Sequence, residues 1–310
     1  NLKVGYESQL NKGYFTQVQN SNFPPTTLLN VAAIGATPVT ANADGSDYSF
    51  VGTFSTANIS YQDKYVISGS FRRDGSSRFG SENKYGDFWS IGGSWNIDKE
   101  KFFNSLKVLS SLKLRASYGL SGNAGIGNYT ALALYGYGSN YINSPGSSPT
   151  QPGNPLLTWE VNKPLNVGID FGMFKNRLNF NIDYYDRKTT QLLLNVPVPL
   201  STGFSTFPGN IGAMQNKGIE LAVNAVLVQT KNLQWDARFN ISKNTNTITA
   251  LNNNQDIVSG SFIRRVGYDF QTFYVRQYAG VDPTNGDPLW YLDSTKTTTT
   301  NVYSKAQRVL

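Results

Sequence analysis

The side chains that most often carry out enzyme chemistry are absent or poorly spaced in this sequence. The 310 residues include no His and no Cys, which excludes imidazole acid–base catalysis, thiolate nucleophiles and the common zinc ligand sets. Asp183 and Asp186 form a carboxylate pair of the kind that glycosidases use, but residues three apart on a β-strand point to opposite faces. We therefore expect no catalytic residue, no bound cofactor and no metal site.

Two glycine-containing segments have the composition of ligand-binding loops without the complete pattern. Residues 122–127 have the sequence Gly-Asn-Ala-Gly-Ile-Gly, but the Lys-Ser/Thr of a phosphate-binding loop is missing and no helix is predicted after them. Residues 282–287 have the sequence Asp-Pro-Thr-Asn-Gly-Asp, which departs from the spacing of a calcium-binding EF-hand loop. At the second segment a turn between two strands is the better prediction.

Four tyrosines are the best candidates for binding a ligand or a partner. They lie in residues 121–156, a Gly-, Asn-, Ser- and Pro-rich segment that we predict to be a long loop. Tyrosine rings stack on sugars and fill protein interfaces, and loops carry much of protein function. Loop tyrosines also pack within their own loops, so both interpretations stay open. The four residues are Tyr129, Tyr135, Tyr137 and Tyr141.

The elements that would position these loops are β-strands. Residues 178–185 alternate Leu, Phe, Ile and Tyr with Asn, Asn, Asp and Tyr, and about ten segments show this two-residue period. Low charge (15%), 13% aromatic residues and 29 Gly are typical of a β-rich protein. One segment differs: apolar residues recur at helical spacing in residues 98–110, which predicts a short amphipathic helix with Asp98 as its N-cap.

The connections between the predicted strands alternate in length. Residues 62–63, 98–110, 174–176 and 229–231 form short or compact connections, whereas residues 11–47, 74–85, 121–156 and 189–211 form long polar ones. Outer-membrane barrels have short periplasmic turns and long outer loops. The mean hydropathy is −0.35 and no apolar run approaches about 18 residues, so a transmembrane helix is not expected. The fold class predicted is therefore all-β, an antiparallel transmembrane β-barrel.

Charge and aromatic placement fit this prediction. The net charge of +7 is spread along the chain, with adjacent arginines only at 72–73 and 264–265, so nucleic-acid binding is not expected. Six aromatic residues are predicted at or near strand ends, where barrels carry aromatic girdles, although filling of a core is the alternative role. They are Tyr61, Tyr65, Trp89, Trp95, Trp159 and Trp235.

One predicted hairpin, residues 63–97, contains a nonapeptide that resembles a hallmark of the SusC/RagA family of TonB-dependent outer-membrane transporters. Four further stretches of that family occur in the same order, at 112–129 in two parts, 216–221 and 280–288. The nonapeptide could line a lumen or anchor an outer loop, but Gly-Ser-rich turns are normally scaffolding, and we interpret it as structural. It consists of Arg72, Arg73, Asp74, Gly75, Ser76, Ser77, Arg78, Phe79 and Gly80.

The resemblance implies a function that the residues alone do not. Members of the family fold as barrels of 22 strands closed by a plug, so residues 1–310 would be the C-terminal part of the barrel domain, with the plug and the TonB-interacting segment absent from this sequence. It further implies TonB-dependent import of glycans or peptides across the outer membrane of a Gram-negative bacterium. A SusD-like surface lipoprotein would be the partner, and an oligosaccharide or a peptide would be the ligand.

Three alternatives remain at this stage. The segment could be an independent barrel of about ten strands. It could also be a non-transporting outer-membrane structural or adhesive β-protein that uses its long loops to bind a surface partner. A glycan-active enzyme is the third, although no convincing catalytic constellation supports it.

Overall fold

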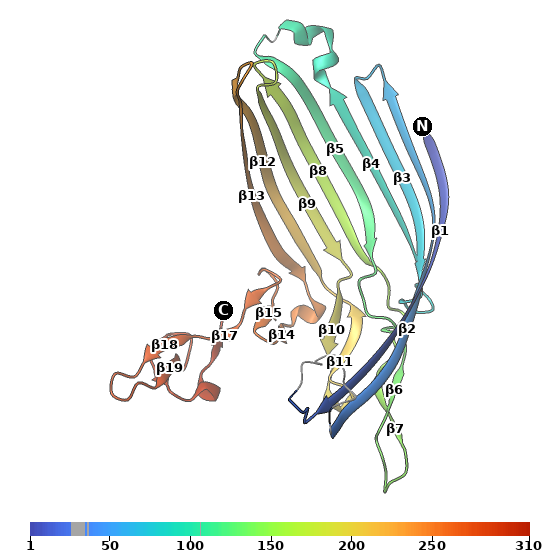
Figure 1. Cartoon of the computed structure of the whole chain (residues 1–310), viewed down its shortest axis with the longest axis vertical. Helices are drawn as coiled ribbons and strands as arrows, with labels where there is room; N and C mark the ends of the chain where they lie inside the picture. Colours follow the sequence, from blue (N-terminus) through green and yellow to red (C-terminus); the bar gives the residue numbers. More distant parts are fainter. Residues whose placement is uncertain (26–34, 36, 106) are drawn as a thin grey trace.

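A curved nine-stranded antiparallel sheet makes up most of the computed structural model (Figure 1), which describes residues 1–25, 35, 37–105 and 107–310. Its order is β1-β2-β3-β4-β5-β8-β9-β12-β13, so each strand pairs with the neighbouring long strand in the chain. The sheet is open at β1 and β13 and forms part of a barrel wall. The strands are β1 Leu2–Ser21, β2 Thr37–Tyr61, β3 Tyr65–Ser76, β4 Tyr85–Asn96, β5 Leu109–Asn123, β8 Glu160–Met173, β9 Leu178–Thr190, β12 Ala213–Gln229 and β13 Gln234–Ala250.

The remaining elements are short and lie in the connections and the C-terminal region. Among the described residues no helix is long and apolar enough to span a bilayer. The small strands are β6 Leu134–Tyr137, β7 Ser147–Gln151, β10 Leu193–Pro197, β11 Thr206–Asn210, β14 Ile257–Ser259, β15 Phe262–Arg264, β16 Thr272–Phe273, β17 Val275–Arg276, β18 Tyr278–Val281, β19 Pro288–Tyr291, β20 Thr299–Thr300 and β21 Arg308–Val309. The 3-10 helices are η2 Ile97–Lys99, η3 Lys101–Ser105, η4 Leu200–Thr202, η5 Asn252–Asn254 and η6 Tyr303–Lys305.

The sheet has one apolar face and one polar face, as the two-residue period predicts. Strand pairing places Ile169 beside Ile182 and Ile182 beside Leu221, so their side chains share what we name the outer face. Some residues of this face are highly exposed, such as Val4 (78%) and Ile59 (64%). A water-soluble sheet would not leave so large an apolar surface open. The outer face is therefore the surface that meets hydrocarbon.

Connections at the two ends of the sheet differ as predicted. The turns β2–β3, β8–β9 and β12–β13 and the compact β4–β5 connection lie at the upper end in Figure 1, and the long connections lie at the lower end. The β5–β8 connection contains the β6–β7 hairpin, and the β9–β12 connection contains the β10–β11 hairpin. By the barrel rule the upper end faces the periplasm and the lower end the outside.

Two predictions about local structure were wrong. Residues 11–47 are not one long loop, because β1 and β2 stay paired as far as Ser21 and Thr37. This ribbon is polar and exposed on both faces, so its backbone ladder forms without the apolar alternation that would reveal it. Residues 98–105 form the 3-10 helices η2 and η3 rather than one longer helix, and Asn96, not Asp98, precedes the first of them without a side-chain cap. Leu106, part of that prediction, lies outside the described residues.

Aromatic residues occur near both ends of the outer face. Tyr65 stacks on Trp95 at the short-turn end, with ring centroids 6.2 Å apart, and Trp89 meets Tyr118 edge-on at 5.8 Å nearer the long connections. These two levels match the aromatic girdles of barrels. Trp159 was wrongly assigned to a girdle, because it is only 6% exposed and belongs to the core of the long connections.

A glutamate joins the first two compact turns at the short-turn end. Glu100 accepts hydrogen bonds from Tyr65 Oη (2.6 Å), Lys64 Nζ (2.9 Å) and Trp95 Nε1 (3.3 Å). The hydrogen bonds from Tyr65 and Lys64 lower the pKa of Glu100 below its ordinary value. The carboxylate thus fastens the β4–β5 connection to the β2–β3 turn.

Candidate functional site

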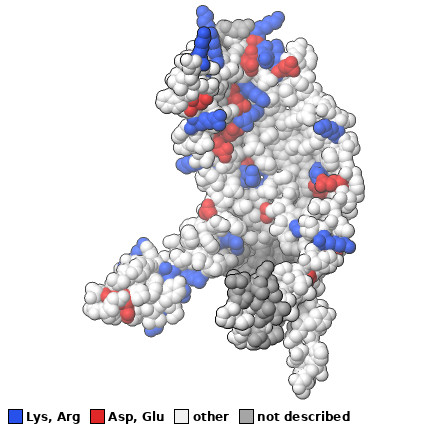
Figure 2. All heavy atoms as spheres, in the orientation of Figure 1, with Lys and Arg blue, Asp and Glu red and all other residues white. Residues whose placement is uncertain are grey.

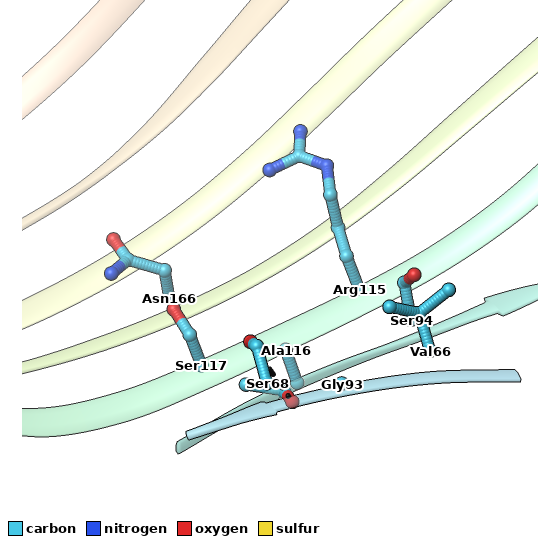
Figure 3. Close-up of a pocket in the computed structure, with 9 residues that line it drawn as sticks. Val66, Ser68, Gly93, Ser94, Arg115, Ala116, Ser117 and Asn166 are labelled. Atoms are coloured by element: carbon cyan, nitrogen blue, oxygen red, sulfur yellow. Dashed lines mark hydrogen bonds between the residues drawn. The ribbon is translucent and has the colours of Figure 1, made fainter. Parts of the chain in front are cut away.

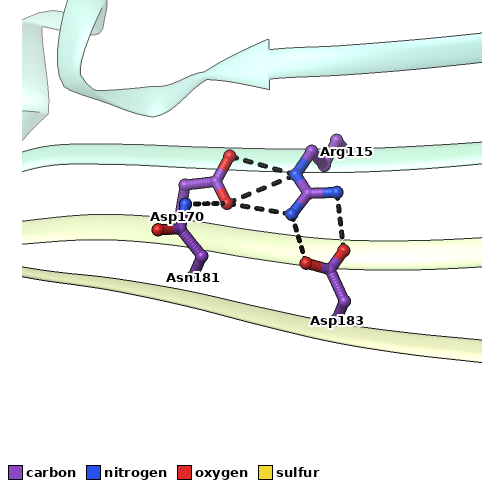
Figure 4. Close-up of polar contacts among 4 residues, drawn as sticks. All are labelled: Arg115, Asp170, Asn181 and Asp183. Carbon is purple, nitrogen blue, oxygen red and sulfur yellow. Dashed lines mark hydrogen bonds and ion pairs between the residues drawn. The ribbon is translucent and has the colours of Figure 1, made fainter. Parts of the chain in front are cut away.

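The inner face of the sheet carries an ion-pair network centred on one arginine (Figure 4). Arg115 binds Asp183 through Nη1 (2.6 Å) and Nη2 (2.7 Å), and Asp170 through Nε (3.0 Å) and Nη2 (3.1 Å). Asn181 donates a further hydrogen bond to Asp170 (2.9 Å). Gly168 is on β8, which lies between β5 and β9. A side chain at this position would place its Cβ 2.6 Å from Arg115 Cζ, so only glycine leaves room for the guanidinium. All three guanidinium nitrogens of Arg115, on β5, therefore bind carboxylates on the next two strands, β8 and β9.

The wall beside this network is made of small polar side chains. Ser68, Ser94, Ser117 and Asn166 project from the same side of the strands as Arg115 and line a hollow of about 250 Å³ (Figure 3). Figure 2 shows basic and acidic side chains side by side over the sheet. Mixed charges and hydroxyls are typical of a wetted lumenal surface and would be costly against lipid.

The family nonapeptide begins on β3, and its alternation divides the residues between the two faces. Arg72 points inward, where its Nε binds Asp74 (2.6 Å) and its Nη2 binds Glu7 (2.7 Å). Arg73 points outward and lies 3.6 Å from Asp87. Two neighbouring arginines therefore meet different surroundings, the lumen and the outer face.

Arg72 and Asp74 also border a hollow of about 410 Å³ at the base of the long connections. Phe50 and Trp159 supply aromatic surface to it, and Arg78 and Asn123 supply polar groups. Aromatic rings beside charged groups can bind sugars or peptides. The lining of this hollow is therefore suited to such a ligand.

The second half of the nonapeptide holds the long connections together. Phe79 is 2% exposed, and its ring centroid lies 4.7 Å from that of Trp159, with Phe88 completing the cluster. Arg78 donates to Asn128 Oδ1 (2.8 Å) and lies 4.0 Å above the ring of Tyr48. These contacts support the structural interpretation for residues 78–79.

Hydrogen bonds extend this junction to a third connection. Gly80 N donates to Leu157 O (2.9 Å), and a Cβ on Gly80 would collide with the carbonyl of Pro155. Asn154 donates to Pro208 O (2.8 Å). The β3–β4, β5–β8 and β9–β12 connections thus form one unit, which we name the loop platform: residues 77–84, 124–159 and 191–212.

The four tyrosines are not equivalent. Tyr129 donates from its hydroxyl to Asp47 Oδ1 (2.6 Å), which raises the pKa of the phenol, and accepts from Asp47 N (2.7 Å). Tyr135 and Tyr137, on the β6–β7 hairpin, and Tyr141, beyond β6, are 64%, 91% and 77% exposed. This hairpin projects farthest from the sheet at the lower end in Figure 1. Three of the tyrosines are therefore available for contact, and Tyr129 fastens the platform to β2.

The segment considered for calcium, residues 282–287, has local hydrogen-bond partners instead. Asp282 accepts from Thr284 Oγ1 (2.6 Å) and Thr284 N (2.9 Å) in the turn between β18 and β19, and these bonds lower its pKa. In the described part of the chain no group of three or more His, Cys, Asp or Glu is placed to hold a metal ion. The Asp183–Asp186 pair is divided as predicted, with Asp183 in the inner network and Asp186 on the outer face beside Lys217.

The site contains features that sequence reasoning missed. The Arg115 network was not predicted, although its strand positions can be derived from alternation once the register is known. Arg115, Gly168 and Asp183 are direct cross-strand neighbours in β5, β8 and β9. The contact of Phe79 with Trp159 has no periodic signal, because both residues lie in irregular connections.

The sequence and the fold match one family of outer-membrane proteins. The family model for the β-barrel of TonB-dependent receptor-like proteins matches residues 1–303. TonB-dependent receptor P39 of Formosa agariphila is 37% identical over 242 residues, 78% of this chain and 23% of that protein. TonB-dependent receptor SusC of Bacteroides thetaiotaomicron is 35% identical over 263 residues, 78% of this chain and 26% of SusC.

A solved structure agrees with the sequence matches. The RagAB peptide transporter superposes with a TM-score of 0.81 at 32% identity, over 99% of this chain and 35% of that chain. The chain belongs to the TonB-dependent receptor β-barrel family, and the resemblance to its SusC/RagA members is confirmed. It is an outer-membrane β-barrel segment of a Gram-negative bacterium. It spans about a quarter of the length of the curated relatives it matches.

Proposed function

We propose that this chain supplies wall and outer loops to a TonB-dependent importer that takes up oligosaccharides or peptides. The main observation in support is the sheet itself, which has an apolar outer face, a charged inner face and its long loops at one end. The similarity to SusC and to the RagAB peptide transporter supports nutrient import as the process. A plug and a TonB-interacting segment, outside residues 1–310, would couple transport to TonB, and a SusD-like lipoprotein would bind over the loop platform.

The exposed tyrosines fit the proposed partner or ligand contact. Tyr135, Tyr137 and Tyr141 present aromatic surface at the end that faces outward, where a lipoprotein or a sugar would arrive. The hollow bordered by Arg72, Phe50 and Trp159 lies behind them, at the base of the platform. We propose that the tyrosines make the first contact with the lipoprotein or the ligand, and that the hollow binds the ligand nearer the lumen.

Uptake measurements on the full-length protein test this proposal. A strain lacking its gene is supplied with labelled oligosaccharides and peptides, with and without a functional TonB system. The proposal predicts that uptake of one of these classes needs both the gene and TonB. Normal uptake of every tested compound in the deletion strain, together with lost surface adhesion, would favour the adhesive alternative.

A further inference from the structure

The apolar outer face ends at a level where charged side chains begin. On β9, Phe180, Ile182 and Tyr184 are followed on the same face by Asp186 and Lys188. The same change occurs on neighbouring strands, at roughly eight to twelve residues from the short-turn end of each. The outward charged residues at this level are Arg73, Asp87, Lys163, Asp186, Lys188, Lys217 and Lys243.

Two lysines at this level face each other directly. Lys163 on β8 pairs with Lys188 on β9 in the strand register, so their Cβ atoms are about 5 Å apart on one face. Lys217 on β12 is opposite Asp186 and is therefore the diagonal neighbour of Lys188. Three ammonium groups thus share this patch with one carboxylate, which already accepts a hydrogen bond from Gln215 Nε2 (2.7 Å). We name Lys163, Lys188 and Lys217 the lysine patch.

The charges of the lysine patch are not neutralised within the described chain. Neither Lys163, Lys188 nor Lys217 has an ion pair within 4.0 Å among the described residues, whereas Arg115 on the inner face has two. Like charges directly opposite each other destabilise a strand pair. An anion bound between the ammonium groups would remove that repulsion, and a phosphate group has the charge and the acceptor oxygens for it.

The position of the lysine patch indicates the source of that phosphate. Leu165, Tyr184 and Ile219 are the apolar residues that precede it on the outer face, toward the short turns. A molecule that covers both surfaces needs acyl chains beside the apolar belt and a phosphorylated headgroup at the lysines. Since the long connections lie on this side of the belt, the headgroups are those of the outer leaflet.

We propose that the lysine patch binds the phosphate groups of an anionic outer-leaflet lipid and so fixes a lipid molecule against β8, β9 and β12. The site is on the hydrocarbon side of the wall and is separate from the inner hollow and the loop platform. It does not depend on what the protein imports.

Native mass spectrometry of the full-length protein in detergent tests the proposal, with bisphosphorylated lipid A as the probe and dephosphorylated lipid A beside it. The unchanged protein should bind the phosphorylated lipid preferentially, and added salt should weaken that binding. Lys163→Gln with Lys188→Gln should lower its affinity about tenfold or more. Lys163→Arg with Lys188→Arg should retain it, because the charge remains.

A charge-matched control uses the opposite end of the same hairpins. Lys175→Gln with Lys231→Gln removes two exposed lysines from the short turns and should leave the affinity unchanged. Equal affinity of the unchanged protein for both lipids would overturn the proposal, and so would equal losses in the two Gln double variants. If inorganic phosphate at the same phosphate concentration displaced the lipid, the bound phosphate would not need to come from a lipid, and this part of the proposal would be wrong. The salt dependence of the unchanged protein gives a test even if a variant fails to fold.

Discussion

At the short-turn end of the sheet, Glu100 gathers Tyr65, Lys64 and Trp95 around one carboxylate. At the long-connection end, Phe79, Phe88 and Trp159 form a buried aromatic cluster with hydrogen bonds between three connections. The first region is polar and joins two successive hairpins, whereas the second is apolar and joins residues far apart in the sequence. Stability should therefore depend more strongly on the second region, because complete burial of a large ring outweighs a partly buried ion pair at the sheet end.

The largest effect is expected from the aromatic cluster. Phe79→Ala leaves a cavity beside Trp159 and should lower the free energy of unfolding by about 3–5 kcal/mol. Denaturant unfolding of the full-length protein measures this, and cleavage of the loop platform by protease should increase. Phe15→Ala, at a ring that is 58% exposed on β1, is the control and should have little effect. Equal effects of the two variants would contradict the role of the cluster.

An intermediate effect is expected in the wall between the two ends. Arg115→Ala removes the ion pairs to Asp170 and Asp183, but the arginine side chain is 35% exposed. After allowance for solvent screening, we expect a loss of about 1 kcal/mol in the free energy of unfolding, smaller at high salt. Arg238→Ala, on the same face and without an ion pair among the described residues, is the matched control. A loss as large for Arg238 would show that the network adds nothing.

A smaller and pH-dependent effect is expected at the short-turn end. The pKa of Glu100 is lowered in the folded state, so its contribution is complete above the unfolded-state pKa and is lost as the pH falls through the folded-state pKa. Glu100→Gln should be less stable than the unchanged protein at neutral pH, and the difference should vanish in acid. Unfolding curves across this pH range measure it. Glu82→Gln, at an exposed loop residue, should show no such difference, and a difference independent of pH would contradict the assignment.

The smallest effect on stability, within about 0.5 kcal/mol, is expected at the exposed tyrosines. Tyr135→Ala with Tyr137→Ala should leave unfolding unchanged and weaken binding of the proposed lipoprotein or ligand. Tyr129→Phe should lower the free energy of unfolding, because it removes the hydrogen bond to Asp47. It should leave binding unchanged, because the exposed rings stay intact. Unfolding and binding measured on both variants distinguish tyrosines that contact the partner or ligand from a tyrosine that stabilises the fold. Unchanged binding in the double variant would remove Tyr135 and Tyr137 from the proposed site.

The parts of the fold that the sequence predicted are those where a local pattern has a physical cause. Residues 178–185 alternate because one face meets lipid, and the beginning of that strand was predicted correctly, although β9 continues to Thr190. The paired extension of β1 and β2 was missed because both of its faces are polar. The aromatic core was missed for a different reason: Phe79 and Trp159 meet only after the connections pack together, and neither has a periodic neighbour. The loop tyrosines were found by composition, which could not distinguish bonded Tyr129 from exposed Tyr137.

The central claim is that adjacent residues of one strand face hydrocarbon and a wet lumen. Leu221 on β12 pairs with Ile182 and Ile241, whereas Ala222 pairs with Asn181 and Asn240. The described chain contains no Cys, so Leu221→Cys and Ala222→Cys in the reconstituted full-length protein can each carry one spin label. We predict that the label at position 221 has high accessibility to oxygen dissolved in the lipid and that the label at position 222 has low accessibility. Equal oxygen accessibility at the two positions, or the reverse order, would contradict the two-faced wall.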